Sequence, residues 1–165
     1  MTARDMQASH EEFSIKAYEP GDARATIDIF LRAIREVASR DYGPAQIAAW
    51  AKVEDSQVWA QYRASRPTWL AMDGATPVGF ADLKADGCLD MMFVDPDYQG
   101  RGVASLLLAT VEQAAREQGL SRIFTEASLT ARPFFERRGF WVVTTQQVQK
   151  RGQTFINFLM EKSLR

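Results

Sequence analysis

The chain has 165 residues and a mass of 18.6 kDa, which is the size of one ordinary domain. Hydrophobic residues make up 46% and charged residues 25% of the sequence, a balance that is typical of a globular protein and excludes a disordered chain. The 20 basic and 21 acidic side chains nearly cancel, so the composition argues against nucleic-acid binding. No apolar run reaches the roughly 20 residues that a membrane span requires, so no membrane partner is expected.

Few residues are available as metal ligands or nucleophiles, because the chain has one cysteine, Cys88, and one histidine, His10. A single cysteine excludes an internal disulfide, and the two residues together leave too little for a zinc site, so no metal is expected. His10 lies in a polar stretch, residues 1–12, that we predict to be a flexible N-terminus outside any catalytic triad. That stretch lacks the apolar core of a secretory signal, which together with a free thiol favours a cytoplasmic location.

The first half of the chain predicts strands and short helices. Residues 13–18 alternate apolar and polar side chains, as a half-buried strand does. Apolar residues recur at spacings of three and four over 23–37, which predicts an amphipathic helix. Breaks at 41–44 and near Asp55 each precede a short helix. Three strands joined by glycine turns then form a meander at residues 68–72, 76–83 and 88–94.

The second half predicts a long amphipathic helix over 102–118, which ends before Gly119. A strand over 121–126 and a short helix over 130–138 follow, and a strand pair at 141–148 and 154–160 ends the chain. No repeat or linker divides these elements, so the sequence predicts one mixed α/β (α+β) domain.

The most informative segment is Gln99-Gly-Arg-Gly-Val-Ala104, a glycine-rich loop between an apolar strand and the long helix. N–H groups in the first turn of a helix lack partners inside the helix, and the helix dipole adds positive charge there. Glycines let a phosphate approach that backbone closely, and the side chains of Gln99 and Arg101 add donors. The segment therefore predicts a diphosphate site. It differs from the dinucleotide fingerprint, because Ser105 stands where the third glycine belongs, and from the P-loop, which needs a lysine.

This segment resembles the acetyl-CoA motif of the GNAT superfamily of N-acetyltransferases, Q/R-x-x-G-x-G/A. The later stretch Ala131-Arg-Pro-Phe-Phe-Glu-Arg-Arg-Gly-Phe140 is similar to the second signature of the family, A-x-x-F-Y-E-K-x-G-F. The order of elements also fits, so the resemblance covers nearly the whole chain. It implies a single N-acetyltransferase domain over 13–165. Its central sheet would be mixed and mostly antiparallel, flanked by helices, and splayed at the strands 88–94 and 121–126.

The resemblance also implies acetyl-CoA as the cosubstrate, lying where those two strands separate. Backbone N–H groups of the glycine-rich loop would hold the pyrophosphate, and an exposed strand edge would pair with the pantetheine arm. A backbone N–H near Phe93 would polarise the thioester carbonyl. The expected cofactor-binding residues are Met92, Phe93, Val94, Gln99, Gly100, Arg101, Gly102, Val103, Ala104, Ser128 and Phe134, with Ser128 at the usual asparagine position of the family.

Direct attack of an amine on the thioester requires an acid that protonates the leaving thiolate. The usual acid of the family is a tyrosine in the second signature, where this chain has Phe135. A phenyl ring donates no proton, so another group must act. Tyr42, in the break between the first two helices, and Tyr98, beside the glycine-rich loop, are the candidate tyrosines, and bulk water is a third source.

The attacking amine must also lose a proton to a base. Asp90 is the first candidate, because a carboxylate between the apolar residues around it would be partly desolvated. By the two-residue period of a strand it shares a face with Cys88 and Met92. Glu126, at the end of the neighbouring strand, is the second candidate. Cys88 fits a small buried hydrophobe better than a nucleophile.

Two functions of different classes follow from the sequence. One is an acetyl-CoA-dependent N-acetyltransferase that moves an acetyl group directly to a primary amine of a small molecule or a protein. The other, suggested by Phe135, is a CoA-binding regulatory or sensing module with little catalysis. Residues 1–100 hold 16 acidic and 10 basic side chains, which favours a cationic acceptor. A homodimer is compatible with the resemblance, because dimers are frequent in the superfamily.

Overall fold

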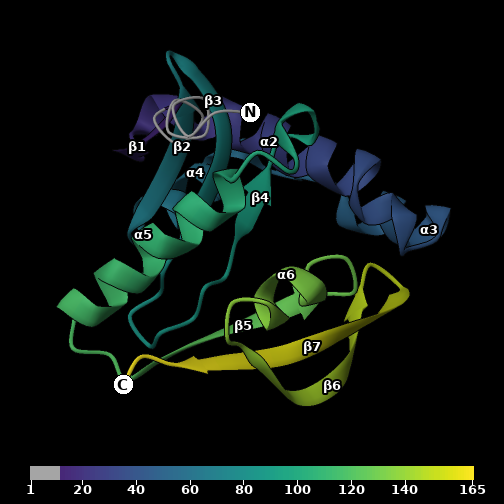
Figure 1. Cartoon of the computed structure of the whole chain (residues 1–165). Helices are drawn as coiled ribbons and strands as arrows, with labels where there is room; N and C mark the ends of the chain where they lie inside the picture. The colour runs from purple at the N-terminus through teal and green to yellow at the C-terminus, as the bar shows by residue number, and fades with distance from the viewer. Residues whose placement is uncertain (1–11) are drawn as a thin grey trace, which may run out of the picture.

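The computed structural model describes residues 12–165, so His10 and nearly all of the expected flexible N-terminus lie outside the described residues. The described chain forms two antiparallel sheets covered by helices (Figure 1). The first sheet has the order β1-β2-β3-β4 and the second the order β5-β7-β6. The strands are β1 (Phe13–Ala17), β2 (Thr68–Asp73), β3 (Thr76–Asp82), β4 (Met92–Val94), β5 (Arg122–Ser128), β6 (Trp141–Lys150) and β7 (Gln153–Ser163).

Helices of very different length connect these strands, in the order that the sequence predicts. The α-helices are α2 (Ala23–Glu36), α3 (Pro44–Trp50), α4 (Ser56–Ala64), α5 (Val103–Glu117) and α6 (Arg132–Glu136). Single 3-10 turns are η1 (Pro20–Asp22), η2 (Ala38–Arg40) and η3 (Pro96–Tyr98). Within residues 12–165, no helix combines the length and the apolar character that crossing a membrane requires.

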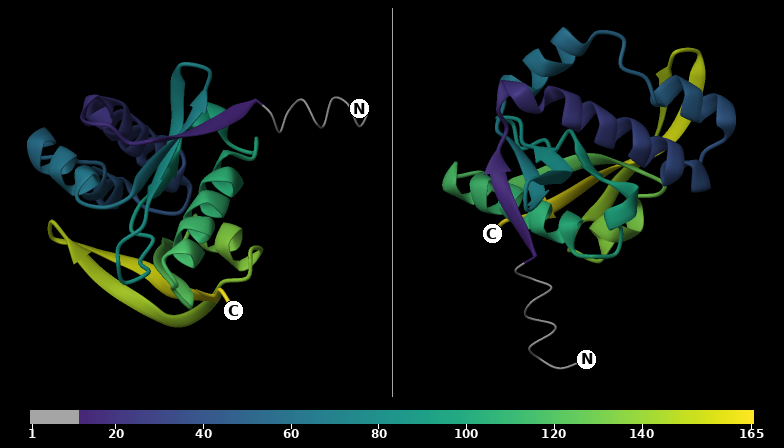
Figure 2. Two further views of the ribbon diagram at one scale, coloured as in Figure 1. Left: turned by 90° about the vertical axis from the view of Figure 1, so that its left-hand side faces the viewer. Right: turned by 90° about the horizontal axis from the view of Figure 1, so that it is seen from above.

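The two long helices cover opposite faces of the first sheet. α2 turns an apolar stripe toward one face, with Ile34 fully buried against Leu70 and Phe80 of the sheet. α5 buries Leu107 and Val111 on the other face, in a core shared with the second sheet. Figure 2 shows the result, in which the first sheet lies as a middle layer between the helices of the N-terminal half and α5.

One strand is shorter than the sequence predicts. The expected strand over 88–94 pairs regularly with β3 only from Met92, as β4. Ahead of it, the Asp82 carboxylate accepts the N–H groups of Asp90 and Met91, at 3.1 and 2.8 Å. A side chain therefore takes bonds that a neighbouring strand would have made, and the chain bends before β4 begins.

The two sheets meet at one point and then separate. Cys88 and Phe124 form an isolated parallel bridge, and Leu89 N–H donates to the Phe124 carbonyl at 2.9 Å. The Thr125 hydroxyl donates to the Leu89 carbonyl at 2.8 Å from the same place. Past this junction β4 pairs only with β3, and β5 only with β7. The predicted splay of the central sheet is therefore confirmed, and β4 and β5 are the two strands that separate.

Candidate active site

The splay opens a cleft of about 610 Å³ between β4 and β5. Most of the residues that the sequence predicts for binding and catalysis line it, although they come from separate parts of the chain. These are Tyr42, Asp90, Met92, Phe93, Val94, Gln99, Ala104, Glu126, Ser128 and Phe134. The other four predicted residues, Gly100, Arg101, Gly102 and Val103, belong to the loop and first helical residue beside the cleft.

The hydrogen bonds of β4 show which of its backbone groups are already used. The Met91 carbonyl accepts the N–H of Asp82 at 3.0 Å, and Asp95 N–H donates to the Val78 carbonyl at 2.8 Å, so both residues bond to β3. Phe93 lies midway between them and directly opposite β3. Because alternate residues of an antiparallel strand point their backbone groups the same way, the Phe93 N–H faces β3 and not the cleft.

The backbone groups of Met92 and Val94 consequently face the gap between the sheets. The Gln99 side chain supports this orientation, because its Nε2 donates to the Val94 carbonyl at 3.1 Å from the open side. The edge of β4 therefore offers two N–H groups to the cleft. Gln99, expected to donate to a phosphate, instead buttresses the end of β4.

The glycine-rich loop ends in a helix N-terminus with free donors. Gly100 and Gly102 have φ angles of +72° and +87°, values that residues other than glycine rarely adopt. The first bond back into this loop runs from Leu106 N–H to the Gly102 carbonyl, at 3.0 Å. Among the described residues, the N–H groups of Val103 and Ala104 therefore have no partner within α5, and they carry the positive end of its dipole.

Two arginines lie near the glycine-rich loop, and the structure orients them differently. Arg101 pairs with Glu12 and lies over the Tyr98 ring at 4.8 Å, so its guanidinium points away from the cleft. Arg138 instead reaches the first turn of α5, where its Nη2 donates to the Ser105 hydroxyl at 2.6 Å. Its guanidinium also lies over the Phe134 ring at 3.8 Å. A fixed cation therefore stands beside the free N–H groups, although it comes from the second signature and not from the loop.

The candidate acids hold structural hydrogen bonds. The buried Tyr42 hydroxyl donates to the Ile156 carbonyl at 2.7 Å and accepts the Leu129 N–H at 3.0 Å. Burial raises the pKa of Tyr42, against the opposing effect of the Leu129 N–H. Tyr98 donates to Asp73 at 2.9 Å, outside the cleft lining. Both tyrosines thus use their protons within the fold.

Asp90 differs from the expectation that it is desolvated among apolar residues. Its side chain is 44% exposed and forms an ion pair with Arg66 at 3.0 Å. Because residues 88–91 are not a strand, the face that Asp90 was expected to share with Cys88 and Met92 does not exist. The prediction that apolar neighbours surround this carboxylate is therefore wrong. Its neighbour is Arg66, which is far away in the sequence and neutralises its charge.

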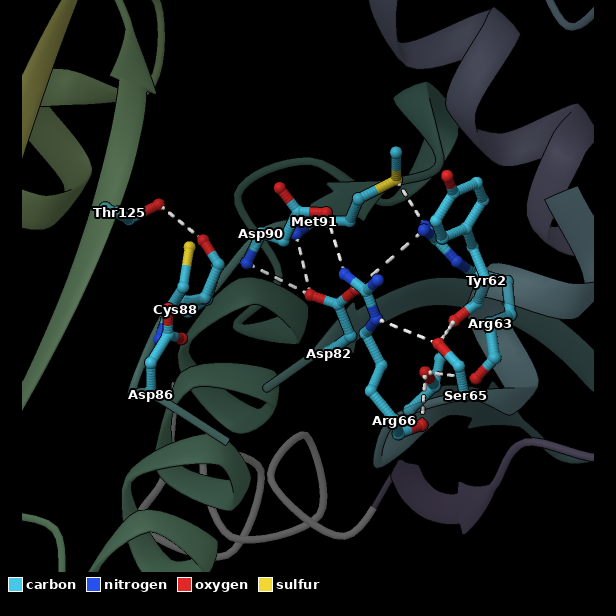
Figure 3. A network of polar contacts seen from close by, with 12 residues as sticks. Tyr62, Arg63, Ser65, Arg66, Asp82, Asp86, Cys88, Asp90, Met91 and Thr125 are labelled. Atoms are coloured by element: carbon cyan, nitrogen blue, oxygen red, sulfur yellow. Dashed lines mark hydrogen bonds and ion pairs between the residues drawn. The ribbon is translucent and has the colours of Figure 1, made fainter. Parts of the chain in front are cut away.

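The buried carboxylate of this region is Asp82, which the sequence analysis missed (Figure 3). Asp82 is 0% exposed, and Arg63, 3% exposed, places Nη2 4.0 Å from its Oδ2. Arg66 lies at 3.7 Å from the same oxygen and so joins Asp82 to Asp90. Burial raises the pKa of Asp82 and lowers the pKa of Arg63. The sequence did contain a signal for this residue, because Asp82 is the aspartate that ends the apolar strand β3.

Glu126 lies on the opposite wall of the cleft, on β5, and its side chain is solvent-accessible. Lys150, at the end of β6, lines the same cleft. Partial burial and Arg151 lower the pKa of Lys150, against the opposing charges of Asp90 and Glu126. Among the described residues, no group of three His, Cys, Asp or Glu side chains is placed to hold a metal ion. The carboxylate of Glu126 and the ammonium of Lys150 are groups that supply acid–base and electrostatic chemistry.

Comparisons with known proteins identify the family and the fold of the chain. Residues 38–164 match the family model of the acetyltransferase (GNAT) domain. YafP of Escherichia coli strain K12, an uncharacterized N-acetyltransferase, is 43% identical over 146 residues, which make up 88% of this chain and 93% of YafP. The crystal structure of a GCN5-related N-acetyltransferase from Rhodopseudomonas palustris has a TM-score of 0.89 at 34% identity, covering 91% of this chain and 94% of that one.

A third structure, yncA from Salmonella typhimurium with its cofactor acetyl-CoA, shares the fold with a TM-score of 0.71 at 18% identity. The match covers 93% of this chain and 95% of yncA. The fold and the site together define an acyltransferase of the type that transfers acetyl groups to nitrogen. This chain belongs to the GNAT acetyltransferase family, and the resemblance noted in its sequence is confirmed at that level.

Proposed function

We propose that the protein is an acetyl-CoA-dependent N-acetyltransferase that moves the acetyl group directly to a primary amine. One observation carries the proposal: the same cleft is bordered by the edge of β4, where the N–H groups of Met92 and Val94 are free, and by the start of α5 with its free N–H groups. Residues 13–165 would form the catalytic domain. The cytoplasmic location and the homodimer stay predictions.

The pyrophosphate of acetyl-CoA fits the start of α5. The N–H groups of Val103 and Ala104 and the dipole of a 15-residue helix favour negative charge there. Gly100 and Gly102 have open space where a side chain would stand, so the backbone itself is accessible. Arg138 adds a positive charge at the same turn.

The pantetheine arm fits the free edge of β4, because an extended amide chain adds to such an edge as a further strand does. An N–H of Met92 or Val94 would then donate to the thioester carbonyl. That donor stabilises the negative charge that develops on the oxygen as the amine attacks. The proposed oxyanion donor is thus next to Phe93 and not on it.

Glu126 is the proposed base, because Arg66 already neutralises Asp90 whereas Glu126 has no basic partner within 4.0 Å among residues 12–165. The nitrogen forms the new bond to the acetyl carbon, the carbon–sulfur bond breaks, and the amine proton goes to Glu126, directly or through water. Phe135 is buried and offers no proton, so the CoA thiolate takes its proton from solvent. Membership of an enzyme family disfavours the alternative of a sensing module with little catalysis.

Calorimetry with acetyl-CoA on a matched pair of variants tests this proposal. Gly102→Glu places a carboxylate among the proposed phosphate donors and is expected to weaken binding roughly tenfold or more, which is about 1.4 kcal/mol. Gly119→Glu is the control, because Gly119 also has a positive φ and open space around its Cα but follows the far end of α5. Equal binding by the wild type and Gly102→Glu would show that the pyrophosphate lies elsewhere.

A further inference from the structure

The second sheet forms the wall of the cleft opposite β4, which we call the acceptor side. It carries one negative and one positive side chain without an ion-pair partner among the described residues. Arg66 neutralises Asp90 at 3.0 Å, which leaves the carboxylate of Glu126 and the ammonium of Lys150. In the part of the chain that the structure describes, neither of these two groups has an ion-pair partner within 4.0 Å. The other charged lining residues, Lys84 and Asp86, belong to the turn at the closed junction of the sheets.

Glu126 and Lys150 belong to the same face of the second sheet. Their register partners on β7, Leu159 and Gln153, are separated by an even number of residues, and directly opposed residues share a face. Phe155 lies between those partners and faces the cleft with them. A ligand on this face would therefore meet a negative charge, an apolar surface and a positive charge. The side chains of Glu126 and Lys150 are close enough for the charge of Glu126 to act on Lys150.

The backbone beside Lys150 is anchored, although it lies next to a hairpin turn. Its neighbour Arg151 donates from Nε to Glu54 at 3.1 Å and from Nη1 to the Ala49 carbonyl at 2.5 Å. These bonds tie the tip of the β6–β7 hairpin to the end of α3, and Figure 2 shows the two segments side by side. Arg151 has a φ of +47°, an unfavourable conformation for a residue with a side chain, which the anchoring bonds offset.

An aromatic cluster lies next to the acceptor side. The Trp50 ring centroid lies 5.6 Å from that of Tyr42, 6.1 Å from Phe155 and 6.5 Å from Phe93, in edge-to-face arrangements. All four line the cleft, and Trp50 and Phe93 are only half-buried. Accessible aromatic edges favour an acceptor with an apolar body, because burying such surface is worth about 25 cal/mol per Å².

We propose that the acceptor is a free amino acid with an apolar side chain, bound as a zwitterion; this rests on the transferase function proposed above. Lys150 binds its carboxylate, and the aromatic cluster holds its side chain. Glu126 faces its ammonium and takes one proton from it before attack, directly or through water. The nitrogen loses its second proton to solvent as the carbon–sulfur bond breaks, and the CoA thiolate takes a proton from solvent. A polyamine or an aminosugar carries further positive charge, which Lys150 repels, and offers no anion to pair with it.

Release of CoA thiol with four acceptors tests this inference. L-Phenylalanine and L-methionine carry all three features, phenethylamine lacks only the carboxylate, and spermidine lacks both the carboxylate and the aromatic or thioether body. We expect kcat/KM for L-phenylalanine to exceed that for phenethylamine by roughly tenfold, since a charge-assisted hydrogen bond is worth about that factor. An equal or higher value for phenethylamine or spermidine would overturn the zwitterion assignment.

Variants of Lys150 separate charge recognition from a general loss of structure. Lys150→Met is expected to raise KM for L-phenylalanine roughly tenfold and leave phenethylamine unchanged, and Lys150→Arg to restore the preference in part. Lys52→Met is the control, because Lys52 is exposed and outside the cleft lining. An equal loss with both acceptors would refute the role of Lys150. Absence of thiol release with every amine, despite tight acetyl-CoA binding, would instead contradict the proposed transferase function.

Discussion

Replacing Asp82 tests the buried network that sets the start of β4. Asp82→Ala would leave the Arg63 guanidinium, 3% exposed, without its nearest carboxylate, and would remove the acceptor of the Asp90 and Met91 N–H groups. An uncompensated buried charge costs about 3–5 kcal/mol, and an unpaired buried donor about 1–3 kcal/mol. The two effects share one site and are not additive, so we expect a loss of about 3–5 kcal/mol in the free energy of unfolding.

Asp82→Asn separates the cost of the uncompensated Arg63 charge from the cost of the unpaired N–H groups. The asparagine oxygen still accepts both N–H groups, so only the charge compensation of Arg63 is lost and the destabilisation should be smaller than for alanine. Urea unfolding followed by circular dichroism measures both variants, with an unchanged m-value as evidence of the same transition. Asp28→Ala is the control, because Asp28 is 57% exposed and pairs only with Arg24 at 3.4 Å. A loss below about 1 kcal/mol for Asp82→Ala, or one equal to the control, would refute the reasoning.

Three further predictions concern single side chains. Burial raises the pKa of Cys88 to about 12 from 9.0, so at pH 8 its reaction with a disulfide reagent should be about a thousandfold slower than that of an unhindered thiol; a rate within tenfold would contradict this. Tyr42→Phe removes two backbone hydrogen bonds and should lower stability by about 1–3 kcal/mol in urea unfolding while kcat stays within a few-fold, whereas loss of kcat without loss of stability would make Tyr42 a catalytic acid. Gly87→Ala should lower the melting temperature by several degrees, because a Cβ there would lie 2.8 Å from the Arg122 carbonyl oxygen at a φ of +97°, and an unchanged melting temperature would place this turn differently.

Local patterns predicted much of the fold because the forces that decide them are local. The apolar stripe of 23–37 and the end of the long helix before Gly119 follow from residues close in sequence, and both are present in the structure. The predicted strand over 88–94 failed for the opposite reason. Asp90 and Met91 bond to the side chain of Asp82, eight and nine positions earlier, and a periodic pattern does not report such a bond.

The polar contacts of the site were the hardest to predict, because they join residues far apart in the chain. Nothing near Asp90 in sequence indicates that Arg66 neutralises it, and nothing near Arg101 indicates that its guanidinium turns toward Glu12. Nothing near Arg138 in sequence indicates that it reaches Ser105, at 2.6 Å. Spacing motifs predict which backbone groups are donors, whereas the direction of charged side chains is decided by the tertiary fold.

The central claim is that the gap-facing edge of β4 receives the thioester carrier, and amide hydrogen exchange measured by NMR tests it residue by residue. Saturating CoA is expected to slow exchange of the Met92 and Val94 amides markedly. The Phe93 amide should change little, because it already faces β3. Unchanged exchange at Met92 and Val94 in the presence of bound CoA, or equal slowing at all three residues, would contradict the assignment.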